Sequence, residues 1–330
     1  GRMSQVKTGV ALAAMLLSIA VSAAPAWADD DIGTQLVDAF EKVYGVHPGY
    51  RANHAKGIVT EGSFKATADA AALSVSPLFA GASIPVTVRF SDSGGLPDVH
   101  DGSDGANPHG ISIKFKLPNG DESDIVSNSL KFFPVSNGED FRSFLLAVAA
   151  SPPDAPKPTK LDEFLQSHPT VGAALGTLGI PDSFADEEYY GIDAFIFVNK
   201  AGQRQPFRYI ISPEHIVHIS AADAAKKPPN YLMDELPARL KSGPVTFQLR
   251  AQLAAPGDPT NDATKPWPAD RKVVDLGTLT IDHVVADSDA VQKQLLFLPG
   301  NLTDGIEPSD DPLIDVRDAA YPVSYARRNP

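Results

Sequence analysis

The segment 57–67, Gly-Ile-Val-Thr-Glu-Gly-Ser-Phe-Lys-Ala-Thr, alternates in side-chain character with a period of two, which is typical of a β-strand with one buried face. Three more segments with this kind of pattern follow it along the chain, at 84–91, 110–117 and 123–126. Gly, Asp and Asn residues separate them and favour turns. The first half of the chain is therefore predicted to fold as successive β-strands.

Helices and a second group of strands are predicted beyond these segments. An amphipathic pattern predicts a helix over 31–44, and further helices are expected at 139–150, 161–178 and near 229–240. The second strand group covers 191–198, 206–211, 245–254 and 273–281. Strands come first, then helices, then strands again, which favours an α+β fold with an antiparallel β-barrel and inserted and flanking helices over a doubly wound parallel sheet.

Composition excludes several classes of protein. The chain has 330 residues, 28 Lys and Arg against 41 Asp and Glu, and no cysteine. Disulfide scaffolds, zinc ribbons, iron–sulfur proteins and cysteine nucleophiles are excluded, and the acidic balance disfavours a nucleic-acid partner. Motifs for serine hydrolases, nucleotide loops and zinc proteases are absent from the sequence. The Asp-rich segment 98–105 lacks the ligand spacing of a calcium loop and is predicted to be solvated.

The N-terminus has the features of a secretory signal. Gly1 and Arg2 precede Met3 and are interpreted as a cloning remnant; Lys7 then precedes an apolar run at 10–24, and Ala26-Trp-Ala28 resembles a cleavage site. The alternative is a membrane anchor, but the run of about 15 residues is shorter than the roughly 20 needed to span a bilayer. We expect residues 1–28 to be removed after Ala28, leaving 29–330 as one periplasmic or secreted domain with no membrane anchor.

A histidine between two cations is the first candidate for chemistry. His54 lies between Arg51 and Lys56, just before the first predicted strand. Both cations would disfavour an imidazolium and favour the neutral ring, which can accept a proton. Taken alone, this run is equally compatible with a structural histidine.

Five motifs in order resemble those of the haem catalases. They are Arg51-x-x-His54-Ala-Lys-Gly57, Val88-Arg-Phe-Ser91, His109-Gly-Ile-Ser-Ile-Lys-Phe115, Asp124-Ile-Val-Ser-Asn128-x4-Phe133 and Arg317-x-x-x-Tyr321-x6-Arg328. The resemblance covers residues 45–330 and is closest to the short bacterial catalase-related peroxidases. It implies the haem-catalase type of β-barrel.

The spacing of the C-terminal motif agrees with one helix face. Residues 317, 321 and 328 are four and seven apart, so on an α-helix the two arginines and the tyrosine point in similar directions. Pro322 is expected to kink this helix. Tyr325 is a competing phenol, but its offsets from the arginines do not match the family's pattern.

The resemblance implies a role for each matching residue. Tyr321 would ligate the haem iron, and Arg317 would hydrogen-bond it. His54 would act as the acid and base on the peroxide, with Ser91 orienting its ring and Asn128 donating to the peroxide. The remaining matches would surround the haem: Phe133 and Phe141 as packed aromatic residues, and Arg51, Arg89 and Arg328 as partners of the propionates.

The implied function is an exported peroxidase with haem, expected to be of b type. It would reduce hydrogen peroxide or organic hydroperoxides with an unidentified reducing donor, with weak catalase activity. The resemblance does not extend to the long N-terminal arm or the C-terminal helical region of large catalases, so no NADPH and a monomer or small homo-oligomer are expected. Two alternatives stay open: an enzyme that rearranges fatty hydroperoxides, and a non-catalytic periplasmic barrel that binds haem or a lipid.

Overall fold

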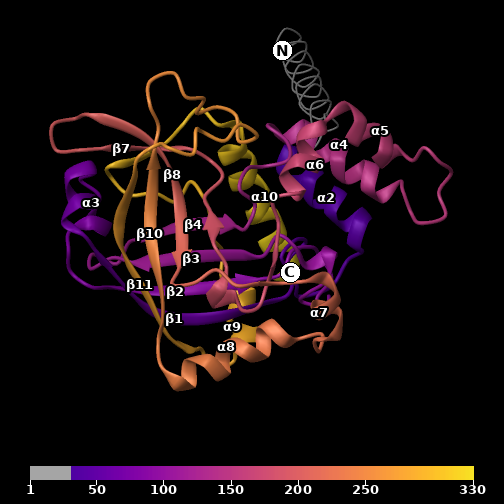
Figure 1. Ribbon diagram of the computed structural model, residues 1–330, viewed down its shortest axis with the longest axis horizontal. Helices are drawn as coiled ribbons and strands as arrows, with labels where there is room; N and C mark the ends of the chain where they lie inside the picture. The colour runs from indigo at the N-terminus through magenta and orange to yellow at the C-terminus, as the bar shows by residue number, and fades with distance from the viewer. Residues whose placement is uncertain (1–30) are drawn as a thin grey trace, which may run out of the picture. The chain divides into compact units, whose positions relative to one another are not determined.

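An antiparallel β-barrel forms the centre of the fold in the computed structural model, which describes residues 31–330 (Figure 1). Eight strands close on themselves in the order β10, β11, β1, β2, β3, β4, β6, β8 and back to β10. Their bounds are β1 (Gly57–Ala66), β2 (Ile84–Ser91), β3 (Gly110–Lys116), β4 (Glu122–Asn128), β6 (Tyr189–Tyr190), β8 (Arg204–Pro213), β10 (Val245–Leu253) and β11 (Val273–Val284). The predicted barrel is confirmed.

The remaining strands are short. β7 (Phe195–Val198) pairs with β8 and also with β12 (Ile306–Pro308), while β5 (Ile180–Pro181) and β9 (His218–Ile219) form a separate pair. In Figure 1, strands β1 to β4 run across β8, β10 and β11. The predicted bounds of the first strand group agree with these elements to within two residues at either end, because both the alternation and the turn residues mark them.

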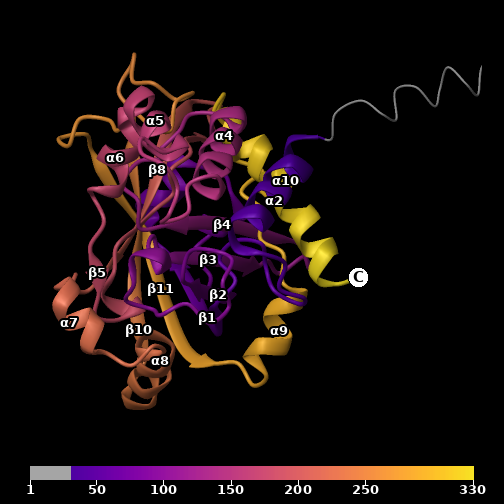
Figure 2. The same cartoon turned by 90° about the vertical axis from the view of Figure 1, so that its right-hand side faces the viewer.

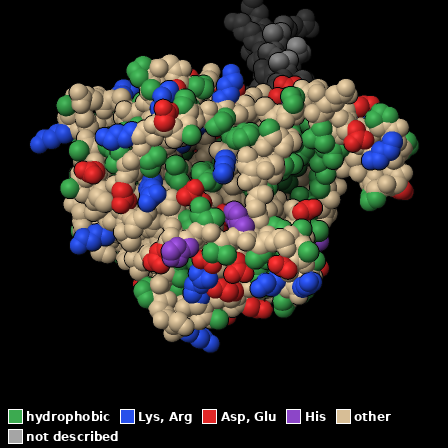
Figure 3. Space-filling view, in the orientation of Figure 1, with side chains coloured by type: hydrophobic (Ala, Val, Ile, Leu, Met, Phe, Trp, Pro, Cys, Tyr) green, Lys and Arg blue, Asp and Glu red, His purple; other side chains and the backbone are tan. Residues whose placement is uncertain are grey.

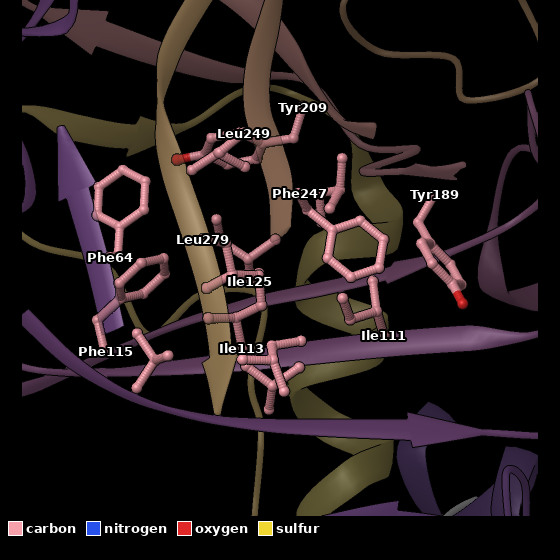
Figure 4. Packing of buried hydrophobic residues seen from close by; sticks show 14 of the residues in the cluster. Phe64, Ile111, Ile113, Phe115, Ile125, Tyr189, Tyr209, Phe247, Leu249 and Leu279 are labelled. Atoms are coloured by element: carbon pink, nitrogen blue, oxygen red, sulfur yellow. The ribbon is translucent and has the colours of Figure 1, made fainter. Parts of the chain in front are cut away.

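Large apolar side chains fill the barrel. Phe64, Phe115, Phe247 and Tyr189 are almost completely buried, and Figure 4 shows them gathered inside the strands. The rings of Phe64 and Phe115 meet edge to face with their centroids 5.4 Å apart, a favourable aromatic geometry. The interior of the barrel is therefore a packed core, and the candidate site has to lie outside it.

Helices cover one side of the barrel and one of its ends. α2 (Ile32–Tyr44) packs against both α4 (Gly138–Ala149) and α10 (Pro312–Arg328), and Figure 2 shows α2 beside α10. The other helices are α3 (Ala68–Leu73), α5 (Lys160–Ser167), α6 (Pro169–Leu175), α7 (Ala221–Lys226), α8 (Tyr231–Ser242) and α9 (Ser288–Gln294). Acidic and basic side chains are mixed over α7 and α8 in Figure 3, as on ordinary solvated surfaces.

Three predicted segments differ from the structure. The strand expected over 191–198 begins only at Phe195. The helix expected over 161–178 is two helices, because Pro169 provides no backbone N–H and disfavours the helical conformation of His168 before it. The segment 98–105 is not simply a solvated loop, since the side chain of Asp101 is completely buried. None of the described helices is long and apolar enough to span a bilayer. The predicted signal peptide, 1–28, lies outside the described residues.

Candidate active site

Strand register brings the first site residues together. Across the barrel, Gly57 of β1 pairs with Ser91 of β2, Ser91 with Gly110 of β3, and Gly110 with Asn128 of β4. These four residues form a row at one end of the four strands. His54 precedes Gly57 by three residues, so the register places it beside Ser91 and within reach of Asn128.

The backbone and ring of His54 are both held in specific positions. Its φ of 54° lies in the left-handed region, which is unfavourable for a residue with a side chain. Its Nδ1 is hydrogen-bonded to Ser91 Oγ at 3.0 Å. Gly110 makes room for this pair, since a Cβ there would lie 2.7 Å from Ser91 Oγ and 3.2 Å from His54 Nδ1.

His54 is neutral at neutral pH, as predicted, but for a different reason. Burial is the largest cause that lowers its pKa to about 3, and the charge of Arg89 is the next. Lys56 turns away and forms an ion pair with Asp101 at 2.6 Å. The explanation by Arg51 and Lys56 was therefore wrong, although the neutral form that it predicted is the one present.

Asn128 presents its amide to the same cavity. Its Oδ1 accepts a hydrogen bond from Leu130 N at 3.0 Å, which fixes the orientation of the side chain. The Nδ2 group is thus the part of the amide left to donate to a ligand. Asn128 and His54 both line a cavity of about 110 Å³.

Residues of α10 also line this cavity. Arg317 Nε donates to Tyr321 Oη at 3.0 Å, while its other nitrogens donate to Asp193 and, at 3.0 Å, to Val126 O. Burial opposes the charge of Arg317, but Tyr321 and Asp193 outweigh it and raise the pKa of Arg317. Tyr321 lines the cavity. Tyr325 instead donates to Gln294 Oε1 at 3.3 Å, and Pro322 lies inside a single helix.

Three arginines converge on one side of the cavity. Arg51 and Arg328 both donate to the carbonyl of Leu295, at 2.8 and 2.6 Å, and Arg89 donates to His54 O at 2.8 Å. Burial lowers the pKa of all three, and repulsion among them lowers those of Arg51 and Arg89 further. Buried cations that repel one another provide a favourable site for anionic groups.

Aromatic side chains line a second cavity, which adjoins the first. Phe133 and Phe141 stack with centroids 5.3 Å apart and lie in the wall of an apolar cavity of about 340 Å³. His54, Asn128 and Tyr321 line both cavities. The structure thus places all ten predicted site residues around two adjoining cavities.

Two neighbours of the site were not found in the sequence. Gln292 Oε1 accepts from Arg89 Nε at 3.0 Å, and its backbone carbonyl accepts from Arg51. Asp193 is completely buried and binds Arg317. Gln292 is 203 residues from Arg89 along the chain, and no local pattern marks it. Asp193 lies in the segment 190–195, which also resembles the haem catalases but was given no role in the site.

The donor set fits a haem. Tyrosine is the residue that ligates haem iron in catalases. Here Tyr321 accepts a hydrogen bond from Arg317, and a histidine and an asparagine line the same cavity. The cluster of Arg51, Arg89 and Arg328 would suit two propionates. Among residues 31–330, no group of three or more His, Cys, Asp or Glu side chains is arranged to hold a bare metal ion.

Comparison with curated proteins gives relatives that match over nearly their full length and longer relatives that match over part of it. A catalase-related peroxidase of Mycolicibacterium paratuberculosis is 37% identical over 299 residues, covering 89% of this chain and 94% of that protein. One of Synechococcus elongatus is 34% identical over 324 residues, covering 97% and 95%. The catalase of Sus scrofa is 28% identical over 302 residues, covering 84% of this chain and 56% of that protein.

Solved structures agree on the fold. A fungal catalase matches with a TM-score of 0.76 at 22% identity, over 84% of this chain and 59% of that chain. A bacterial catalase matches with a TM-score of 0.73 at 22% identity. The family model for catalase covers residues 34–329, nearly the whole of the described fold. The chain belongs to the catalase family.

Proposed function

We propose that this protein is a haem peroxidase that reduces hydrogen peroxide or organic hydroperoxides with electrons from an external donor. One observation carries the proposal: neutral His54, bonded to Ser91, lines the same cavity as the Tyr321–Arg317 pair. The catalase-related peroxidases that match this chain over nearly their full length support a peroxidase.

Haem of b type is the proposed cofactor, in keeping with the catalase family. Tyr321 would ligate its iron, and the bond from Arg317 would favour the phenolate form of this ligand. Arg51, Arg89 and Arg328 would neutralise the propionates. When bound, haem supplies the redox-active iron at which the peroxide O–O bond is cleaved.

The protein's own residues manage the protons. The neutral imidazole of His54 can accept the proton of the peroxide and return it to the oxygen that leaves, and the bond to Ser91 holds the ring for both steps. Asn128 Nδ2 can donate to the peroxide. Overall, one peroxide, two electrons and two protons give one alcohol and one water, or two waters from hydrogen peroxide.

The apolar cavity supports organic hydroperoxides as substrates. Phe133 and Phe141 line it together with other apolar side chains, and it reaches both His54 and Asn128. Burial of the apolar part of an organic hydroperoxide in this cavity would be favourable, because it removes apolar surface from water. Its hydroperoxide group would then lie beside the histidine.

Export is proposed on the N-terminal sequence alone. The positive residue, the apolar run and the Ala-Trp-Ala triplet support removal of residues 1–28. Expression of the chain from Met3 in a Gram-negative host, followed by intact-mass measurement of the periplasmic fraction, tests this proposal. A protein that keeps the mass of the uncleaved chain would refute it.

Haem reconstitution is the experiment that tests the function. The purified protein is expected to bind haem and give a ferric Soret band, which Tyr321→Phe alters and the matched control Tyr325→Phe leaves unchanged. His54→Ala should keep haem but lose peroxide reduction. Failure to bind haem would refute the proposal. Turnover of a lipid hydroperoxide at the same rate with and without a phenolic donor would instead identify a rearranging enzyme.

A further inference from the structure

Two buried carboxyl groups lie close to the segment that carries His54. Asp92 directly follows Ser91, and its side chain has no exposed surface. Neither of its carboxyl oxygens accepts a hydrogen bond from an N–H or hydroxyl group of the described residues. Asp101, the other carboxyl, is also completely buried. An ionised Asp92 would be an unusually costly group in this position.

Asp101 has the partners that an anion requires. Its Oδ1 lies 2.6 Å from Lys56 Nζ. Its Oδ2 accepts hydrogen bonds from Leu232 N at 3.0 Å and Met233 N at 3.3 Å, in the first turn of α8. The N-terminal N–H groups and the dipole of a helix favour a negative charge. The negative charge of the pair therefore belongs on Asp101.

The charges around Asp92 leave it without a cation of its own. His109 Nε2 donates to Asp101 O at 2.9 Å and lies 3.4 Å from Asp92 Oδ1, but burial lowers the pKa of His109 to about 4, so its ring is neutral. The other charged or titratable groups that act on Asp92 are Lys56, which Asp101 neutralises, Arg89, and the buried phenols Tyr189 and Tyr231.

The remaining groups do not reverse this balance. Tyr189 and Tyr231 donate their hydroxyls to the carbonyls of Phe184 and Pro181, and their pKa values are raised, so both stay neutral. Arg89 attracts a charge on Asp92. Burial, followed by the adjacent carboxyl group of Asp101, outweighs Arg89 and Lys56 and raises the pKa of Asp92.

This cluster is joined to His54 through the backbone. Ala55 N donates to Gly94 O at 3.0 Å, and Asp92 N donates to Lys56 O at 2.9 Å. Asn53 Oδ1 accepts from Gly94 N at 2.9 Å. Residues 53–56 are thus bonded to residues 92–94, and this pairing holds His54 in its unfavourable left-handed conformation.

We propose that Asp92 is a protonated carboxylic acid that donates to Asp101, and that the resulting Asp92–Asp101–Lys56 cluster is a clamp that positions His54. The positioning half rests on the proposed function, whereas the protonation half does not. When Asp92 ionises, two adjacent carboxylates share one lysine and repel each other. The loop 92–101 then separates from residues 53–56, and His54 loses its support.

Asp92→Asn tests the protonation half. An amide keeps the shape and can still donate to Asp101, but it never ionises. In the unfolded chain Asp92 ionises near its ordinary value of about 3.9, so the folded parent holds one extra proton above that pH. Relative to Asp92→Asn, the unfolding equilibrium constant of the parent should rise by up to about tenfold per pH unit, until the pH reaches the folded-state pKa.

Thermal unfolding of the haem-loaded protein from pH 5 to pH 9 measures this difference. The midpoint advantage of Asp92→Asn over the parent should widen as pH rises. The matched variant Asp101→Asn removes the partner of Lys56 and should lower the midpoint at every pH. The assignment of the proton to Asp92 would be refuted if the difference in unfolding midpoint between Asp92→Asn and the parent did not change with pH. It would also be refuted if Asp101→Asn lowered the midpoint less than Asp92→Asn does.

Hydrogen exchange and the pH profile test the positioning half. In the parent, protection of residues 53–57, corrected for intrinsic exchange, should fall at alkaline pH while that of β4 does not, and in Asp92→Asn it should persist. As pH rises, the rate of the reaction with peroxide should begin to fall at a lower pH in the parent than in Asp92→Asn. Superimposable exchange or rate profiles would refute the clamp.

These results also separate the two proposals. Unfolding and hydrogen exchange can be measured without peroxide turnover. If their pH dependence shifts as expected in a protein that reduces no peroxide, the proposed function is contradicted, whereas the clamp is still supported. Should Asp92→Asn fail to fold, the parent's own exchange profile decides. Protection of residues 53–57 that stays constant to pH 9 would overturn the proposal.

Discussion

Gly110→Ala places a single methyl group between the two side chains that would manage the proton. The new Cβ would lie 2.7 Å from Ser91 Oγ and 3.2 Å from His54 Nδ1. Gly110 belongs to β3, which is hydrogen-bonded to β2 on one side and to β4 on the other, so its backbone cannot retreat. The side chains of Ser91 and His54 must therefore move, and their 3.0 Å hydrogen bond is lost.

The expected magnitudes follow from this geometry. Overpacking costs about 1–3 kcal/mol and the lost neutral hydrogen bond about 1 kcal/mol, so we expect the free energy of unfolding to fall by about 2–4 kcal/mol. A well-placed acid and base contributes about 10²–10⁴-fold to rate. Displacement of His54 should remove part of this contribution, and we expect a ~10–100-fold slower reaction with peroxide.

Urea unfolding and stopped-flow mixing of haem-loaded protein with peroxide measure the two effects. Gly172→Ala in α6 is the matched control, because apart from the adjoining backbone of its own helix no atom lies within 4 Å of the added Cβ. It should raise stability by about 0.5–1 kcal/mol, as alanine does in a helix, and leave the rate unchanged. A Gly110→Ala protein that binds haem and reacts at the parent's rate would refute the assigned role of the His54–Ser91 pair.

Three further predictions concern the same cavity. Ser91→Ala should lower the free energy of unfolding by about 1 kcal/mol and slow the peroxide reaction without changing haem affinity, as measured by stopped flow and haem titration; an unchanged rate would contradict it. Arg328→Met should weaken haem binding, because the lost cation would otherwise pair with a propionate, while the apo protein should unfold at nearly the parent's denaturant midpoint. Equal haem affinity of the variant and the parent would disprove this. The folded-state pKa of His54, about 3, lies below its ordinary value of 6.5, so the unfolded chain takes up the proton first and stability is lost as pH falls from 6.5 toward 3. His54→Gln should reduce that loss in acid unfolding experiments, and an identical pH dependence would count against a neutral buried imidazole.

The resemblance to the family's C-terminal motif indicated the candidate site residues on α10, and helical spacing agreed with it. Tyr321 follows Arg317 by one helical turn, and in the structure the two are hydrogen-bonded. The structure agrees with the preference for Tyr321 over Tyr325, because of these two tyrosines only Tyr321 lines the cavity. Helical periodicity is a local property, and for this reason the sequence could predict it.

The causes of electrostatic effects could not be predicted in the same way. Arg51 and Lys56 are neighbours of His54 in sequence, yet burial and Arg89 lower the pKa of His54. Asp101 was expected in solvent and is buried against α8. Burial and distance depend on which segments fold together, and no local sequence pattern contains that information.

The sequence by itself determined most of the barrel strands, though not β6, together with their approximate bounds, the family motifs and the residue types of the site. Alternation, turn residues and helical spacing act over short distances, so they can be seen in the sequence. Only the tertiary structure decided that the pairing register of β2, β3 and β4 sets Ser91, Gly110 and Asn128 in one row. It also decided that Gln292 and Asp193 support the arginines and that Asp92 lies beside Asp101. These arrangements depend on contacts between segments far apart in the chain, where packing, desolvation and charge pairing are set jointly.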